Sequence, residues 1–87
     1  MNKLVFTDNS WEEYLYWQTQ DKKTLKRVNA LLKDIKRDSF DGIGKPESLK
    51  HRKDYWSRRI DDCNRIVYTV TNGQIEILQC KGHYDDK

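Results

Sequence analysis

A chain of 87 residues has room for the core of one domain, which we expect to span residues 1–87. No apolar run approaches the ~20 residues of a transmembrane helix, and Cys63 and Cys80 form neither a disulfide framework nor a metal motif. We therefore expect a compact, soluble, cytoplasmic domain with reduced thiols, no metal, no cofactor and no membrane association.

The net charge of +3 conceals two clusters of basic residues. Residues 22–37 hold seven lysines and arginines against one acid, Asp34, and residues 45–65 hold seven against four acids. Such clusters suit a polyanionic partner, because each neutralised phosphate releases condensed counterions. A solvated charged surface accounts for the same pattern equally well, so charge alone leaves both interpretations open.

The N-terminal part of the chain predicts a strand followed by a helix. Residues 3–6 are β-branched and aromatic in their middle, which is typical of a short strand. Ser10 followed by Glu13 fits a capping box, so the helix is predicted to begin at about Trp11.

A second helix is predicted from Asp21, its cap, to about Asp38. Apolar and basic residues alternate along it with helical spacing, so one face should lie in the core and the other in solvent. The apolar stripe consists of Leu25, Val28, Leu31, Leu32 and Ile35, and the basic face of Lys22, Lys23, Lys26, Arg27, Lys33 and Arg37.

The pattern of the C-terminal half predicts a β-sheet. Gly42, Gly44 and Pro46 mark a loop, after which the apolar pattern changes to a period of two. Three consecutive strands are predicted, and Asn72-Gly73 is a strong type I′ hairpin signal between the last two. The strands cover residues 55–60, 65–71 and 74–81. The order β-α-α-β-β-β predicts an α+β domain, a helical hairpin packed on an antiparallel sheet.

Strand alternation predicts a polar site on the sheet face away from the helices. In the middle strand Arg65 points with Val67 and Thr69 away from its apolar neighbours, and Arg59 on the preceding strand can share that face. The 42–50 loop would form the rim, and His83 would follow the end of the last strand.

These residue types suit cleavage of RNA by its own 2′-OH, which needs a base, an acid and cations around the phosphate. Glu47 is the candidate base, and His83 is the candidate acid because imidazole titrates near ~6.5. Arg65 and Arg59 can hold phosphate oxygens bidentately, and Lys50 adds a point charge. Tyr84 could stack on a base or orient the phosphate.

A non-catalytic RNA-binding module remains the alternative at this point, because paired arginines on a sheet often bind phosphate without catalysis. His51 is a competing histidine in a basic loop, where it suits a phosphate contact better than acid catalysis. His83 ranks above it because the end of a strand holds a side chain more rigidly.

The chain also resembles the YoeB family of the RelE/ParE superfamily of bacterial toxins over nearly its whole length. The resembling segments are Ser10–Gln18, the lysine-rich second helix, Phe40-Asp41-Gly42, Gly44-Lys45-Pro46-Glu47, Leu49-Lys50-His51, Trp56–Ile60, Arg65–Tyr68 and His83-Tyr84.

This resemblance implies a ribosome-dependent, metal-free mRNA endoribonuclease that cleaves mRNA in the ribosomal A site and arrests translation. It implies that Glu47 is the general base, His83 the general acid and Arg65 the main transition-state cation. Lys50, Arg59 and Tyr84 would bind substrate. A cognate antitoxin and a homodimer are also implied.

With a ribosome as the target, the basic face of the second helix gains a specific role. Lys26, Arg27 and Lys33 are predicted to contact ribosomal RNA, not the cleaved mRNA. The rival within the superfamily is a gyrase-directed toxin of the ParE branch, which would not need Glu47, Arg65 and His83 together.

Overall fold

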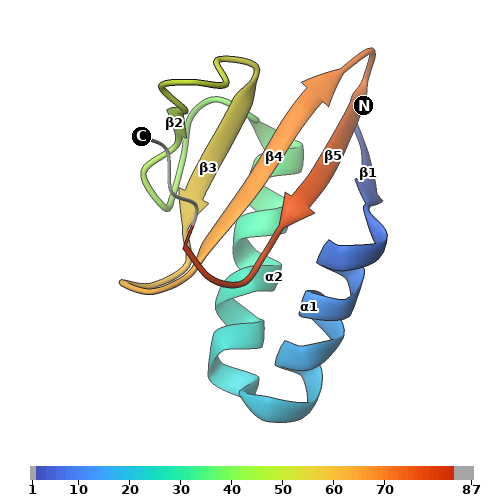
Figure 1. Ribbon diagram of the computed structural model, residues 1–87, viewed down its shortest axis with the longest axis vertical. Coiled ribbons are helices and arrows are strands. Elements are labelled where there is room, and N and C mark those ends of the chain that lie inside the picture. The colour runs from blue at the N-terminus through green and yellow to red at the C-terminus, as the bar shows by residue number, and fades with distance from the viewer. Residues whose placement is uncertain (1, 84–87) are drawn as a thin grey trace.

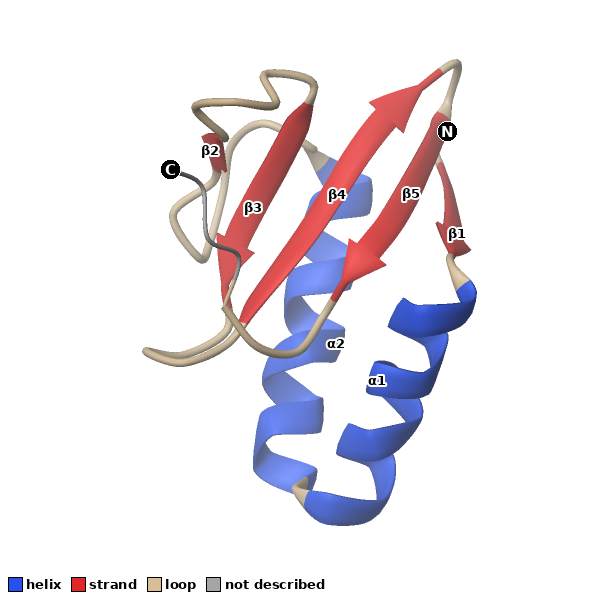
Figure 2. Cartoon of the chain, viewed as in Figure 1, coloured by secondary structure: helices blue, strands red, loops and turns tan. Residues whose placement is uncertain are grey.

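The computed structural model describes residues 2–83 and confirms the predicted helical hairpin on a sheet (Figure 1). Both helices cover the same face of the sheet and leave the other face open (Figure 2). In chain order the elements are β1 (Lys3–Phe6), α1 (Asp8–Gln20), α2 (Lys22–Arg37), β2 (Glu47–Ser48), β3 (Tyr55–Arg59), β4 (Arg65–Thr71) and β5 (Gln74–Gln79).

The five strands form one sheet in the order β1-β5-β4-β3-β2. Strands β3, β4 and β5 pair antiparallel, as predicted, and β2 adds antiparallel to β3, whereas β1 pairs parallel to β5 and makes the sheet mixed. The parallel pair is possible because β1 leads into the helical hairpin and not into a tight turn. Strand β2 was predicted as loop, since two residues show no alternation that a sequence pattern could reveal.

The start of α1 differs from the prediction. Thr7 is the N-cap, and its Oγ1 accepts a hydrogen bond from the Ser10 N–H at 3.1 Å. Ser10 is wholly buried one turn later, where its hydroxyl donates to the Ile77 carbonyl of β5 at 2.6 Å. Glu13 accepts a hydrogen bond from the Cys80 N–H, not from the helix start. Ser10 and Glu13, which resemble a capping box in the sequence, therefore form hydrogen bonds with β5 and the residue after it.

Helix α2 begins where it was predicted to begin. The Asp21 side chain accepts a hydrogen bond from the Thr24 N–H at 3.1 Å, which satisfies one of the free donors of the first turn. Its apolar stripe packs into the core against the inner face of β4 and β5. The buried residues of this contact are Val28, Leu31, Leu32, Ile35, Ile66, Tyr68, Ile75 and Ile77.

The hairpin between β4 and β5 has the predicted turn. Asn72 and Gly73 adopt φ angles of 49° and 76°, the two positive values that a type I′ turn requires. Neither helix within residues 2–83 has the length and apolar character needed to cross a bilayer.

Candidate functional site

A row of directly opposed residues crosses the open face of the sheet. Glu47 of β2 lies opposite Ser57 of β3, Ser57 opposite Val67 of β4, and Val67 opposite Gln79 of β5. Directly opposed residues share a face. Core residues such as Tyr68 occupy the other face, so this row looks away from the helices.

The local backbone sets the position of Glu47 at the edge of the sheet. Gly44 has a φ of +79°, and an added Cβ would lie 2.7 Å from a methyl carbon of Leu31. The Gly44 carbonyl accepts a hydrogen bond from the Arg59 N–H at 2.6 Å, which fastens the loop to β3 before the two-residue strand β2 begins. Only glycine combines this backbone conformation with so close an approach.

Arg59 and Arg65 lie directly opposite each other on β3 and β4, two residues along from the Ser57–Val67 pair and therefore on the same face. The prediction that both arginines share the open face is therefore confirmed. Like charges at opposed positions repel, so the pair is stabilised when an anion lies between them. Guanidinium groups offer fixed forks of donors that match phosphate oxygens.

Glu47 and Arg65 form a loose ion pair, with 3.6 Å between Oε1 and Nη1. The Glu47 side chain is 62% exposed, and that of Arg65 is 20% exposed. Such an exposed contact contributes about 0–1 kcal/mol. The carboxylate can therefore leave the guanidinium at little cost when another anion approaches.

After β5 the chain passes the end of β3 and the start of β4 (Figure 1), where Gly82, the residue before His83, is hydrogen-bonded to both Arg65 and Asn64. The Gly82 carbonyl accepts hydrogen bonds from the Arg65 N–H at 3.1 Å and from the Gln79 side chain at 2.9 Å. The Gly82 N–H donates to Asn64 Oδ1 at 2.7 Å. These bonds fix the backbone immediately before His83, whose side chain is exposed.

The remaining predicted substrate contacts are Lys50 and Tyr84. Lys50 lies exposed in the connection between β2 and β3, at the same edge of the sheet as Glu47. His51 is exposed beside it. Tyr84 lies outside the described residues.

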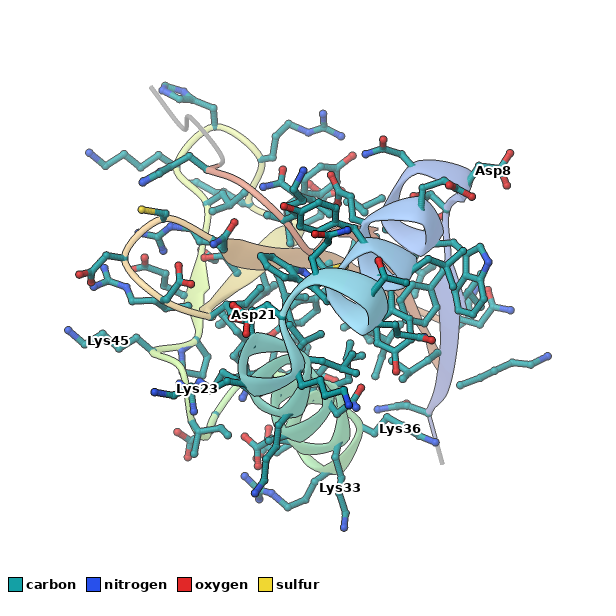
Figure 3. All side chains as sticks on the ribbon, turned by 90° about the horizontal axis from the view of Figure 1, so that it is seen from below. Asp8, Asp21, Lys23, Lys33, Lys36 and Lys45 are labelled. Carbon is teal, nitrogen blue, oxygen red and sulfur yellow. The ribbon has the colours of Figure 1, made fainter. Side chains whose placement is uncertain are left out.

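The predicted ribosome contacts belong to a separate surface. Lys26, Arg27 and Lys33 are exposed on α2, which lies behind the sheet as seen from its open face (Figure 1). Lys33 extends outward from α2 on the side away from the sheet (Figure 3). Arg27 also donates a long hydrogen bond, 3.4 Å, to the Arg59 carbonyl at the end of β3.

Sequence reasoning missed the role of Arg58, which is fully buried on the helix side of β3. Its Nη1 donates to Asp34 Oδ2 at 2.6 Å and to the Ile43 carbonyl at 2.9 Å. Its Nη2 donates to the Asp38 carbonyl at 2.6 Å, and its Nε to Tyr68 Oη at 3.1 Å. One side chain thus joins β3, α2 and the connection that leads to Glu47. Alternation between Trp56 and Ile60 was the available signal, because it assigns a charged residue to the core face.

The same network holds the Asp34 carboxylate ionised. Hydrogen bonds from Arg37 and then from Arg58, together with the Ile43 N–H, lower the pKa of Asp34 to about 2. The Arg37 Nε donates to Asp34 Oδ1 at 2.9 Å from the solvent side. Asp34 therefore anchors the connection from α2 to β2 at Ile43, as a permanent anion at neutral pH.

Ser57 was also missed. Its side chain is fully buried, and its Oγ has no hydrogen-bond partner among residues 2–83. A buried hydroxyl without a partner costs about 1–3 kcal/mol, so native proteins contain few. No sequence pattern indicated this burial, because a serine on the open face of a strand is usually exposed to solvent.

Together the open face holds a carboxylate, two opposed arginines and an adjoining exposed histidine. This arrangement can bind a phosphodiester and transfer protons on either side of it. Within residues 2–83, no three side chains of His, Cys, Asp or Glu gather as a possible metal site.

Known proteins resemble the chain throughout. The family model for a YoeB-like toxin of bacterial type II toxin–antitoxin systems matches residues 6–84. A Synechocystis relative, Toxin YoeB, is 53% identical over 83 residues, which are 94% of this chain and 96% of the relative.

Solved structures agree with the observed fold. A YoeB/ParE toxin from Agrobacterium tumefaciens superposes with a TM-score of 0.90 at 44% identity, covering 94% of this chain and 99% of the other. The YoeB dimer from Staphylococcus aureus gives 0.87 at 45% identity, covering 95% and 98%. A heterotetrameric YoeB–YefM toxin–antitoxin complex from the same organism gives 0.85 at 45% identity, covering 97% and 99%.

A helical hairpin on one face of this sheet, with opposed arginines and a carboxylate on the other, defines a RelE/ParE-like toxin fold. Within that class, the chain belongs to the family of YoeB-like toxins of bacterial type II toxin–antitoxin systems.

Proposed function

We propose that this toxin is a ribosome-dependent endoribonuclease that cleaves mRNA in the A site and thereby arrests translation in the cytoplasm. The observation that carries the proposal is the meeting of Glu47, Arg65 and Arg59 on the open face, with the backbone before His83 fastened to Arg65. Membership of the YoeB-like family supports the same conclusion.

The reaction uses the 2′-OH of the RNA as nucleophile. Glu47 accepts the proton of the 2′-OH while its oxygen forms a bond to phosphorus, and the bond from phosphorus to the 5′-oxygen breaks. His83 donates a proton to that leaving oxygen. The products are a 2′,3′-cyclic phosphate and a 5′-hydroxyl, and no metal or other cofactor takes part.

Cations stabilise the extra negative charge that forms on phosphorus. Arg65 and Arg59 hold the non-bridging oxygens from one side of the sheet, where the two residues are directly opposed on β4 and β3. Lys50 adds charge from the edge, and Tyr84 contacts the substrate. An arrangement fixed before the reaction stabilises the transition state without reorganisation.

A ribosome-dependent enzyme needs two binding surfaces, one for the ribosome and one for the mRNA. The basic face of α2 binds ribosomal RNA through Lys26, Arg27 and Lys33, while the open face receives mRNA. The distribution of charge supports this division, because these exposed cations lie on the helix layer and not beside Glu47.

The toxin is further expected to bind a cognate antitoxin that wraps it and covers or disturbs the open face. It is also expected to form homodimers. The YoeB–YefM complex and the YoeB dimer of Staphylococcus aureus support these two expectations.

Product analysis tests the chemistry. Glu47→Gln should remove the proton acceptor and lower cleavage by a factor of about 10²–10⁴, and the wild type should leave 2′,3′-cyclic phosphate ends. Glu76→Gln is the matched control, because Glu76 is an exposed carboxylate paired with Thr69 on the same face. Fragments with 3′-hydroxyl ends, or equal loss of activity in the two variants, would refute the mechanism.

A further inference from the structure

The buried hydroxyl of Ser57 belongs to the residue directly opposite the candidate base on the neighbouring strand. Ser57 is directly opposed by Glu47 on one side and by Val67 on the other. The Val67 side chain has no polar atom, so of the two side chains directly opposed to Ser57 only that of Glu47 can accept a hydrogen bond from the hydroxyl. Directly opposed side chains of an antiparallel pair have Cβ atoms about 4.5–5.5 Å apart, which one glutamate side chain can span.

In the structure the Glu47 carboxylate is turned to Arg65 and not to Ser57, since the Ser57 Oγ has no partner within residues 2–83. The ion pair is long, 3.6 Å, and the Glu47 side chain is largely exposed. The Glu47 carboxylate therefore has a partner, Arg65, that another anion can replace, and the Ser57 hydroxyl on the neighbouring strand has no partner within residues 2–83.

We propose that Ser57 is a positioning residue for Glu47 in the RNA-bound toxin. When a phosphate takes the guanidinium of Arg65, the Glu47 carboxylate leaves it and accepts a hydrogen bond from the Ser57 hydroxyl. The inference rests on the proposed function, because it assigns Glu47 the role of base.

This exchange solves a conflict within the site. Arg65 cannot offer its donors fully to a phosphate and to Glu47 at once, and a carboxylate released from it would otherwise rotate freely in solvent. A hydrogen bond from Ser57 to one carboxylate oxygen fixes the side chain and leaves the other oxygen to accept the 2′-OH proton. The hydroxyl is held ready by burial on β3.

Ser57→Ala separates this role from a structural one. The variant should cleave mRNA on ribosomes about tenfold more slowly, because it lacks one oriented hydrogen bond in the reacting complex. Its midpoint of thermal unfolding should be unchanged or higher, because the substitution removes a buried hydroxyl that has no partner among the described residues. The acid limb of the rate–pH profile should move to higher pH, because a carboxylate that loses a hydrogen bond holds its proton more strongly.

Ser48→Ala is the matched control, since Ser48 is the exposed neighbour of Glu47 on β2 and pairs with Trp56. It should cleave like the wild type. Ser57→Cys, which keeps a weak donor of similar size, should fall between wild type and Ser57→Ala.

Two results would overturn the proposal. In one, Ser57→Ala cleaves at the wild-type rate with the same pH profile. In the other, it loses thermal stability, and its activity falls only in proportion to the unfolded fraction. Both require a wild type that cleaves, so an inactive wild type would instead count against the proposed function.

Discussion

Arg58 and Asp34 form an ion pair of 2.6 Å that joins β3 to α2, with the Arg58 side chain wholly buried and that of Asp34 15% exposed. The same guanidinium donates to the carbonyls of Asp38 and Ile43. It therefore holds both ends of the segment that precedes Gly44 and Glu47. The Arg58 side chain therefore contributes both to the stability of the fold and to the placement of the candidate base.

Loss of that side chain should be costly. Arg58→Met should lower the free energy of unfolding by about 3–5 kcal/mol, because it leaves buried acceptors and a partly buried carboxylate without their main donor. Arg37→Gln is the control, since Arg37 binds the same carboxylate from solvent with its side chain 61% exposed. It should cost less than about 1 kcal/mol. Urea unfolding measures both, and equal losses would show that burial of Arg58 is unimportant.

The Asp34 carboxylate should make stability depend on pH in the acid range. Its pKa is about 2 in the folded chain against 3.8 for an unperturbed aspartate. A lowered pKa means that the contribution is complete above about pH 4 and is lost as the pH falls toward 2. The stability difference between the wild type and Asp34→Asn should therefore shrink between pH 4 and pH 2. A difference that stays constant from pH 6 to pH 2 would contradict the assigned ion pair.

Neutralising Lys26, Arg27 and Lys33 to glutamine should weaken binding to ribosomes and leave the chemistry intact. The slope of log affinity against log salt concentration should decrease in magnitude by up to about 2–3, because fewer counterions are released on binding. Filter binding at several salt concentrations measures this slope. Arg27→Gln alone is the control for the hydrogen bond between Arg27 and the Arg59 carbonyl. Unchanged ribosome affinity in the triple variant would exclude the α2 surface as the docking site.

Local signals in the sequence predicted much of this fold. Asn72-Gly73 specified its turn, and Asp21 specified the start of α2, because both act through their own backbone. Alternation along β3 and β4 sufficed to place Arg59 and Arg65 on one face.

Features that depend on distant contacts were not predictable in the same way. Thr7 and Ser10 are both suitable helix caps, and only the bond from Ser10 to Ile77 across the core decides between them. The two residues of β2 become a strand only by pairing with β3. The Ser57 hydroxyl, buried without a partner within residues 2–83, is likewise a property of the folded chain that no sequence pattern contains.

The most direct test of the account is primer-extension mapping of mRNA on programmed ribosomes, with wild type and His83→Gln side by side. We predict a cut confined to the A-site codon with the wild type and its loss in the variant, because the leaving 5′-oxygen then lacks its proton donor. The variant should still bind ribosomes, since the substitution leaves the α2 surface unchanged. Folded wild-type protein that binds ribosomes but makes no cut would contradict the account.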